Sequence, residues 1–233
     1  MIKLLLMLAK FAKFGPALKS AAFMLLSVGA YALLFGWRYA VGFVLLMLVH
    51  EFGHYYAARR LGLNVGLPTF IPFVGAWIEL KDQPLSVAQE AQIAFAGPFA
   101  GTVAAVAVLA LALSERSALL MALAYVGFFL NLFNLIPIVP LDGGRAAAAL
   151  HPVFWFVGLL MMVALVVLRP NPILILIVIL GGMDLWRRWK ERGNASAYYK
   201  IPARQRVTVG VVYLGLVLVL ALSMSLTHVE RTL

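Results

Sequence analysis

The sequence contains no cysteine and few charged residues. The absence of cysteine excludes disulfide bonds and thiolate metal sites, so any metal ion has to be held by histidine and carboxylate side chains. Charged residues make up 12% and hydrophobic residues 64% of the 233 residues, whereas a soluble globular domain is about a quarter charged and about half apolar. This composition excludes an ordinary soluble domain and indicates an integral membrane protein.

Acidic residues are scarce, and the formal net charge is +10. The basic residues fall between apolar runs and form no stripe with interleaved aromatic residues, which argues against nucleic-acid binding. An alternating topology places fifteen of the nineteen basic residues on the side of the amino terminus, and only Arg38, Arg116, Arg169 and Arg231 on the other. By the positive-inside rule we expect a multi-pass protein of a prokaryotic cell membrane with a cytoplasmic amino terminus.

The apolar runs predict an all-α polytopic fold with about six to seven transmembrane helices, in one membrane-embedded domain over residues 1–233. The expected spans cover about 18–36, 39–59, 88–113, 117–137, 153–168, 172–187 and 207–227. The fifth and sixth are short and are joined by RPNP, which indicates a tilted hairpin. Ahead of the first span, Lys3, Lys10 and Lys13 share one side of a helix at residues 1–15, which predicts an amphipathic helix on the membrane surface.

Residues 61–85, LGLNVGLPTFIPFVGAWIELKDQPL, interrupt the helical pattern. Proline and glycine recur too often for a helix, and strand-forming residues lie between them. This pattern predicts a short β-hairpin or re-entrant segment after the second span. The following SVAQ predicts a capping box, with Ser86 as N-cap and Gln89 at the third helical position.

The second span carries the pentad HEFGH, which contains His50, Glu51 and His54. Histidines four residues apart lie on one helix face and can bind one zinc ion, while the glutamate between them can act as a general base. At 1.5 Å per residue, His50 lies roughly 16 Å from Tyr39 and roughly 14 Å from Arg59, well inside a bilayer. Ionisable groups at that depth are costly and usually functional. The alternative interpretation is a polar cluster that holds helices together.

A catalytic zinc site needs a third protein ligand. The remaining histidines, His151 and His228, lie at the ends of expected spans. Asp142 lies in a break rich in proline and glycine after the fourth span, where unwound backbone can bring a side chain into a buried cavity. Asp184 competes with it, although its neighbours suggest an ordinary residue of the membrane boundary. We therefore prefer Asp142 as the third ligand.

Two asparagines, Asn131 and Asn134, share a face of the fourth span. An amide within a bilayer usually hydrogen-bonds between helices, and for Asn131 this packing role stands beside a functional one. Asn134 lies closer to the break and could donate a hydrogen bond to a tetrahedral oxyanion. In the third span, FAGPFAG at residues 95–101 is a patch of small residues that favours close helix packing.

Three motifs together resemble the site-2 protease family of intramembrane zinc metalloproteases. In the family's order they are HEFGH at residues 50–54, AGP at 96–98, and Asn134…Pro137…LDGG ending at Gly144. They cover residues about 40–150.

The resemblance implies a zinc ion held by His50, His54 and Asp142. It also implies Glu51 as general base, and it places Asn134 where the family's asparagine helps to bind the substrate or intermediate. A strand-forming segment at residues 63–80 would pair with an extended substrate strand.

The resemblance further implies a catalytic core at about 39–150, with additional spans over 153–227. We expect a short form, without the PDZ module or nucleotide-sensing domain of some members.

The expected function is a zinc-dependent intramembrane endopeptidase. Its partners would be the lipid bilayer and a membrane-spanning protein, which it cleaves within or near the transmembrane segment to release a product on the cytoplasmic side. The alternatives are a membrane zinc transporter and a catalytically inactive scaffolding homologue. A transporter has no evident need for Glu51 between the two histidines, and the intact Glu51 and metal-ligand residues argue against an inactive homologue.

Overall fold

The computed structural model describes the backbone of residues 2–190 and 197–227, and the side chains of residues 15–187, 190 and 197–227. This part of the chain forms eight α-helices, one short 3-10 helix and two short strands. In chain order these are α1 (Ile2–Phe35), α2 (Trp37–Arg60), β1 (Thr69–Ile71), β2 (Gly75–Trp77), α3 (Val87–Glu115), α4 (Ala118–Asn134), α5 (Asp142–Ala147), α6 (Val153–Leu168), α7 (Pro172–Lys190), η1 (Ala197–Tyr199) and α8 (Ala203–Thr227).

Four helical segments in the described residues are long and apolar enough to cross a membrane. They are Gly15–Phe35 within α1, and the helices α2, α3 and α8. Two further apolar helices are shorter, with 17 residues in α4 and 16 in α6. The chain is therefore a mostly helical, multi-pass membrane protein with four candidate spans.

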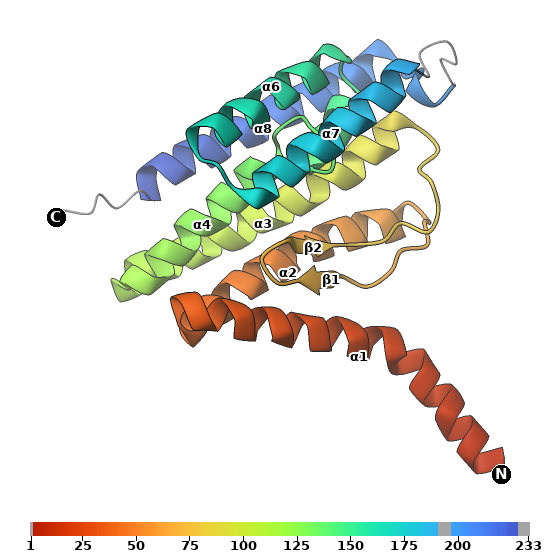
Figure 1. The fold of residues 1–233 in the computed structure, drawn as a ribbon, viewed down its shortest axis with the longest axis vertical. Coiled ribbons are helices and arrows are strands. Elements are labelled where there is room, and N and C mark those ends of the chain that lie inside the picture. Colours follow the sequence, from red (N-terminus) through yellow and green to blue (C-terminus); the bar gives the residue numbers. More distant parts are fainter. Residues whose placement is uncertain (1, 191–196, 228–233) are drawn as a thin grey trace.

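The first helix differs from the expectation. We expected a separate surface helix at 1–15 and a span at 18–36, but α1 runs without interruption through Ile2–Phe35. Pro16 lies inside it, and Figure 1 shows α1 changing direction toward its amino-terminal end. A proline inside a helix removes one backbone hydrogen bond and commonly bends it. The two-sided arrangement expected for Lys3, Lys10 and Lys13 concerns side chains outside the described residues.

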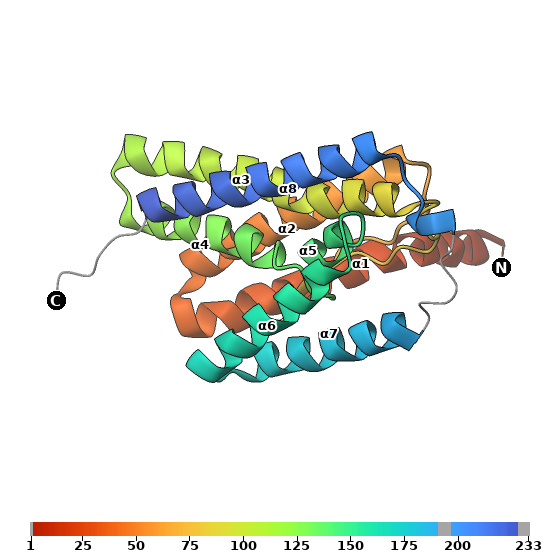
Figure 2. The ribbon, with the colours of Figure 1, turned by 90° about the horizontal axis from the view of Figure 1, so that it is seen from above.

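Helices α2, α3, α4 and α8 pack side by side into a central bundle (Figures 1 and 2). On one flank, α1 packs against α2 and β1. Helices α6 and α7 form the expected hairpin and connect to the bundle through α5. Figure 2 shows this hairpin on the opposite side of the molecule from α3 and α8. The largest hydrophobic core lies between α3, α4, α5, α6 and α8.

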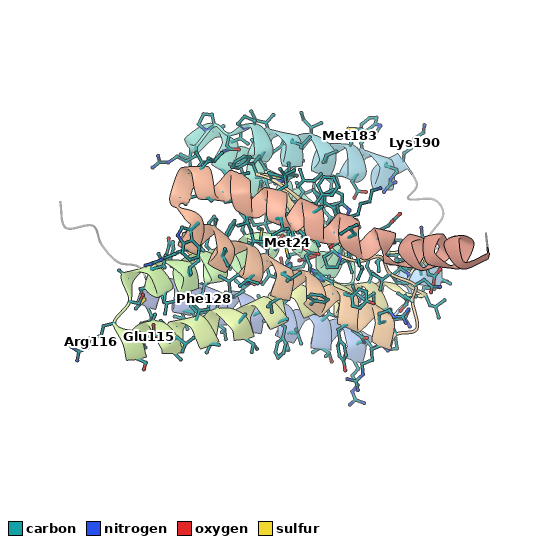
Figure 3. All side chains as sticks on the ribbon, turned by 90° about the horizontal axis from the view of Figure 1, so that it is seen from below. Met24, Glu115, Arg116, Phe128, Met183 and Lys190 are labelled. Atoms are coloured by element: carbon teal, nitrogen blue, oxygen red, sulfur yellow. The ribbon has the colours of Figure 1, made fainter. Side chains whose placement is uncertain are left out.

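The helix connections alternate between the two ends of the bundle. The α1–α2, α3–α4 and α6–α7 turns lie at one end, whereas the start of α1, the α2–α3 connection, the end of α7 and the start of α8 lie at the other (Figure 1). Figure 3 shows Glu115 and Arg116 at the first end and Lys190 at the opposite end.

The hairpin expected after the second span is confirmed as an antiparallel pair of short strands. Its register joins Thr69 to Trp77, Phe70 to Ala76 and Ile71 to Gly75. An isolated bridge between Val65 and Leu80 extends the pairing toward the helices. The pair is tied to α1, because the Tyr31 hydroxyl accepts a hydrogen bond from the Phe73 backbone N–H at 3.2 Å.

Helix α3 begins at the predicted cap. The Ser86 hydroxyl accepts a hydrogen bond from the Gln89 backbone N–H at 3.3 Å. The Gln89 side chain accepts one at 2.9 Å from the N–H of Leu85, one residue earlier than in the usual capping box. Together these bonds fix where α3 starts, and with it the depth of the small-residue patch.

Small residues allow α3 to approach α2 and α4 closely. A Cβ atom added to Gly97 would lie 2.1 Å from His54 Nε2, and one added to Gly101 would lie 2.2 Å from Asn131 Oδ1. Since van der Waals contact needs well over 3 Å, these two glycines leave the space that the polar side chains of α2 and α4 occupy. The sequence-based expectation of close packing at 95–101 is confirmed.

The same close approach predicts that Gly53→Ala destabilises the protein. An added Cβ would lie 2.2 Å from the Ala96 backbone oxygen, so that α2 and α3 would have to separate. We expect a loss of about 1–3 kcal/mol of stability. Gly29→Ala is the matched control, because nothing lies within 4 Å of its added Cβ. Thermal unfolding in detergent should show a lower midpoint for the first variant only; equal midpoints would contradict the close packing.

Candidate metal centre

Two helices separated by a long stretch of sequence bring three potential metal ligands together. His50 and His54 lie on α2, and Asp142 is the first residue of α5. The Asp142 Oδ2 atom lies 3.1 Å from Nε2 of His50 and 3.1 Å from Nε2 of His54. The two Nε2 atoms are themselves 3.1 Å apart. Within the described residues this is the group that could hold a metal ion, and all three side chains are largely buried.

The remaining ring nitrogens of the two histidines determine where their protons lie. His50 Nδ1 is 2.8 Å from Asn131 Oδ1, and His54 Nδ1 is 2.7 Å from the backbone oxygen of Ile93. The orientation of the Asn131 amide is set by its nitrogen, which donates to the Gly127 backbone oxygen at 2.7 Å. Both Nδ1 atoms therefore face acceptors and have to donate.

A neutral histidine that carries its proton on Nδ1 presents a lone pair at Nε2. Two such lone pairs and a carboxylate oxygen point at one another at 3.1 Å, with no hydrogen between them when both rings are neutral. A tetrahedral zinc ion with bonds of about 2.0–2.1 Å holds its ligand atoms roughly 3.3 Å apart, which is close to this spacing. The donor set and its geometry thus fit a metal ion with three protein ligands.

Glu51 directly follows His50 and lies outside this triangle of ligand atoms. It is 6% exposed, and within the described part of the chain it has no ion-pair partner. An unpaired carboxylate in a buried, apolar setting is costly, so its presence beside the two histidines marks a candidate for acid–base chemistry.

The two asparagines of α4 have different surroundings. Asn131 is 2% exposed and contacts His50, so it lies directly behind a candidate ligand. Asn134 is half-buried, and its nitrogen donates to the Leu130 backbone oxygen at 3.0 Å. Sequence reasoning left Asn131 open between packing and function. Asn131 lies at a depth comparable with that of His50 on a neighbouring helix. This depth was the signal that could have indicated a functional role.

Two glycines allow the chain around Asp142 to turn back on itself. A Cβ atom on Gly143 would lie 2.2 Å from the Leu135 backbone oxygen, and one on Gly144 would lie 2.3 Å from the backbone carbon of Ile138. The segment therefore packs backbone against backbone, which places the Asp142 carboxylate at the depth of the α2 histidines. We define residues 135–144 as the aspartate turn.

Helices outside the recognised motifs hold the aspartate turn in place. Trp155 of α6 donates from Nε1 to the Gly144 backbone oxygen at 2.9 Å, and the Tyr213 hydroxyl of α8 donates to the backbone oxygen of Leu135. Both aromatic side chains are buried. Sequence reasoning did not single out either residue, because an aromatic side chain in an apolar span carries no local sign of a distant partner.

The competing ligands lie elsewhere. Asp184 forms an ion pair with Arg187, with 2.6 Å between Oδ1 and the guanidinium nitrogen. His151 is exposed, and its Nδ1 accepts a hydrogen bond from the Val153 backbone N–H at 3.2 Å. His228 lies outside the described residues. Among the candidates that the structure describes, only Asp142 joins the two histidines.

Comparison with known proteins relates the chain to metalloproteases. Residues 38–117 match the model of peptidase family M50. "Putative zinc metalloprotease Rip3" of Mycobacterium tuberculosis is 32% identical over 135 residues, which cover 53% of this chain and 34% of that protein. "Zinc metalloprotease MJ0392" of Methanocaldococcus jannaschii is 30% identical over 120 residues, which cover 48% of this chain and 34% of that protein. The chain thus spans about a third of the length of these curated relatives.

Among solved structures, the site-2 protease from Methanocaldococcus jannaschii is similar to this chain at a TM-score of 0.47 and 18% sequence identity. The similarity covers 77% of this chain and 87% of that one.

The geometry predicts that Asp142→Asn weakens metal binding strongly, because an amide is a poor substitute for a carboxylate ligand. Asp184→Asn is the matched control, since that carboxylate is engaged by Arg187. Metal content after dialysis against a weak chelator should fall from about one zinc per chain toward zero in the first variant only. Equal zinc retention by the two variants would contradict the assignment of Asp142.

Proposed function

We propose that the chain, as a member of the site-2 protease family of zinc metalloproteases (peptidase family M50), is an intramembrane endopeptidase. It would hydrolyse a peptide bond within or near the transmembrane segment of a membrane-spanning protein and release a product on the cytoplasmic side. The observation that carries the proposal is the convergence of His50, His54 and Asp142 at 3.1 Å within a membrane-embedded bundle.

We assign His50, His54 and Asp142 as the zinc ligands. When bound there, zinc supplies a Lewis acid that acidifies water and polarises a carbonyl group. Glu51 acts as the general base: its carboxylate takes a proton from the attacking water and returns it to the amine nitrogen that leaves. In the hydrolysis, a bond forms between the water oxygen and the substrate carbonyl carbon, and the peptide C–N bond breaks.

Residues behind the ligands hold them in the reactive tautomer. Asn131 and the Ile93 backbone oxygen accept the Nδ1 protons of His50 and His54, so both Nε2 atoms keep their lone pairs for the metal. Asn134 has a different role in the proposal. Its amide has a second N–H besides the one bonded to Leu130, and we assign that N–H to the substrate carbonyl or the oxyanion formed from it.

The substrate would bind as an extended strand, because a helix hydrogen-bonded to itself does not expose its peptide bonds. We assign this role to residues 63–80, which contain the β1–β2 pair and the Val65–Leu80 bridge. A strand added to one edge of this pair would satisfy its own backbone groups there while it passes the metal centre.

We further propose a single domain with six or seven membrane spans and a cytoplasmic amino terminus. The common hydrophobic core of α3, α4, α5, α6 and α8 supports one domain. The shorter helices α4 and α6, together with α7, would complete the spans beyond the four long helices. The cytoplasmic side would be the end that holds most of the basic residues.

The rival function is zinc transport. A transport path requires successive sites along its length, whereas the described residues contain one candidate group of three ligands. The buried Glu51 beside that group also has a role in hydrolysis and none in passage. The arrangement therefore favours hydrolysis.

Glu51→Gln should abolish proteolysis while zinc remains bound, because an amide cannot accept the proton from water. The measurement is cleavage of a single-span peptide by the reconstituted full chain, with zinc content determined in the same samples. We expect activity to fall by at least about 10²-fold, the range of a lost general base. Persistent cleavage with zinc still bound would refute this role, and zinc flux without cleavage would favour the transporter.

Asn131→Ala and Asn134→Ala should have different effects, because Asn131 positions a zinc ligand and Asn134 contacts the substrate. Loss of the Asn131 acceptor should weaken zinc affinity about 10–100-fold, as for other groups behind a ligand. Loss of Asn134 should leave zinc affinity unchanged and lower kcat by roughly 10²-fold. Zinc affinity is measured by chelator competition, with unfolding midpoints as a check on folding. Identical effects of the two substitutions on zinc affinity would contradict the division of roles.

A further inference from the structure

A groove lies between the amino-terminal halves of α3 and α8, away from the metal centre residues. Its volume is about 410 Å³, within the range of small-molecule sites. The residues of α3 that line it are spaced as one helix face, and so are those of α8. The lining includes Gln92 and Phe95 of α3, and Arg204, Val209 and Val212 of α8. We call this cavity the α3–α8 groove.

The polar lining side chains lie toward the start of the two helices, together with Ala88 and Pro202, and the lining further along is apolar. Both helices begin at the same end of the bundle and run side by side in the same direction (Figures 1 and 2). Arg204 lies in the first turn of α8, while Val212 follows about 12 Å further along that helix. On α3, Gln92 precedes Phe95 in the same direction. The polar end thus faces the basic end of the bundle and the apolar end faces the membrane interior.

The charge at the polar end is positive and unbalanced. Residues 200–206 contain three basic residues and no acidic one. The Arg204 side chain is exposed and has no ion-pair partner in the described residues, and no carboxylate lines the groove. Glu90, the acidic residue in the first turn of α3, accepts a hydrogen bond from the Tyr198 hydroxyl at 2.5 Å. The positive end of the α8 helix dipole adds to the field of Arg204.

We propose that the α3–α8 groove binds one anionic phospholipid, with its phosphate at Arg204 and an acyl chain along Phe95, Val209 and Val212. The occupant has to be amphipathic because the groove is, and its polar end has to be anionic because the groove presents an unpaired guanidinium there. A phospholipid has both parts in this order when its headgroup lies at the membrane surface. This site is separate from the proposed protease chemistry and does not depend on it.

The test uses the full chain purified in an uncharged detergent and titrated with short-chain phosphatidylglycerol. Phosphatidylcholine with the same chains tests the headgroup, and inorganic phosphate tests for an anion site without a tail. Because a ligand that binds the folded state raises the unfolding midpoint, thermal unfolding gives the affinities. We expect phosphatidylglycerol to bind about tenfold or more tightly than phosphatidylcholine, since the guanidinium–phosphate bonds are charge-assisted.

Two pairs of variants locate the site. Arg204→Gln should remove the preference for phosphatidylglycerol, whereas Lys200→Gln, an exposed cation outside the lining, should retain it. Val212→Trp should fill the apolar part and weaken binding, whereas Val211→Trp should not, because Val211 is 66% exposed and does not line the groove.

Three results would overturn the proposal. An equal response to phosphatidylcholine would show that the headgroup charge is not recognised. An equal response to inorganic phosphate would assign an anion site without a lipid tail. Equal loss of binding in Lys200→Gln and Arg204→Gln would indicate diffuse attraction to the basic surface rather than this groove.

Discussion

Two hydrogen bonds, at the Nδ1 atoms of His50 and His54, determine which ring nitrogens are left to bind a metal ion. With both protons held by Asn131 and the Ile93 backbone oxygen, two lone pairs meet the Asp142 carboxylate at 3.1 Å. Three acceptors so close together repel one another in a medium of low dielectric constant. A cation at their centre would relieve this repulsion. The acceptors on α3 and α4 therefore leave the two histidines of α2 ready to bind a metal ion.

Those acceptors reach the histidines only because the bundle packs closely. Gly97 and Gly101 give α3 a surface without side chains where His54 and Asn131 lie. On the opposite side, the aspartate turn is held by Trp155 and Tyr213, which belong to helices outside the recognised motifs. The later helices thus keep the Asp142 carboxylate at the depth of the α2 histidines. Of these later helices, α8 also lines the α3–α8 groove.

Local features of this chain could be predicted and long-range contacts could not. The spacing of HEFGH, the proline and glycine of the strand segment and the break at Asp142 each act within a few residues, so the sequence alone indicated the candidate ligands and the β pair. The roles of Trp155 and Tyr213 depend on partners in other helices. The continuous α1 was missed because the expected position of Lys3, Lys10 and Lys13 on one side of a helix indicated a separate surface helix ahead of the span.

X-ray absorption spectroscopy of the zinc-loaded chain identifies directly the atoms that coordinate the ion. We expect two imidazole nitrogens and one carboxylate oxygen at about 2.0–2.2 Å from zinc, in a four-coordinate site whose remaining position holds a light atom from solvent. The Asp142→Asn chain should lose this signature. A spectrum with fewer than two imidazoles, or a six-coordinate shell made of oxygen alone, would contradict the convergence of His50, His54 and Asp142 on one ion.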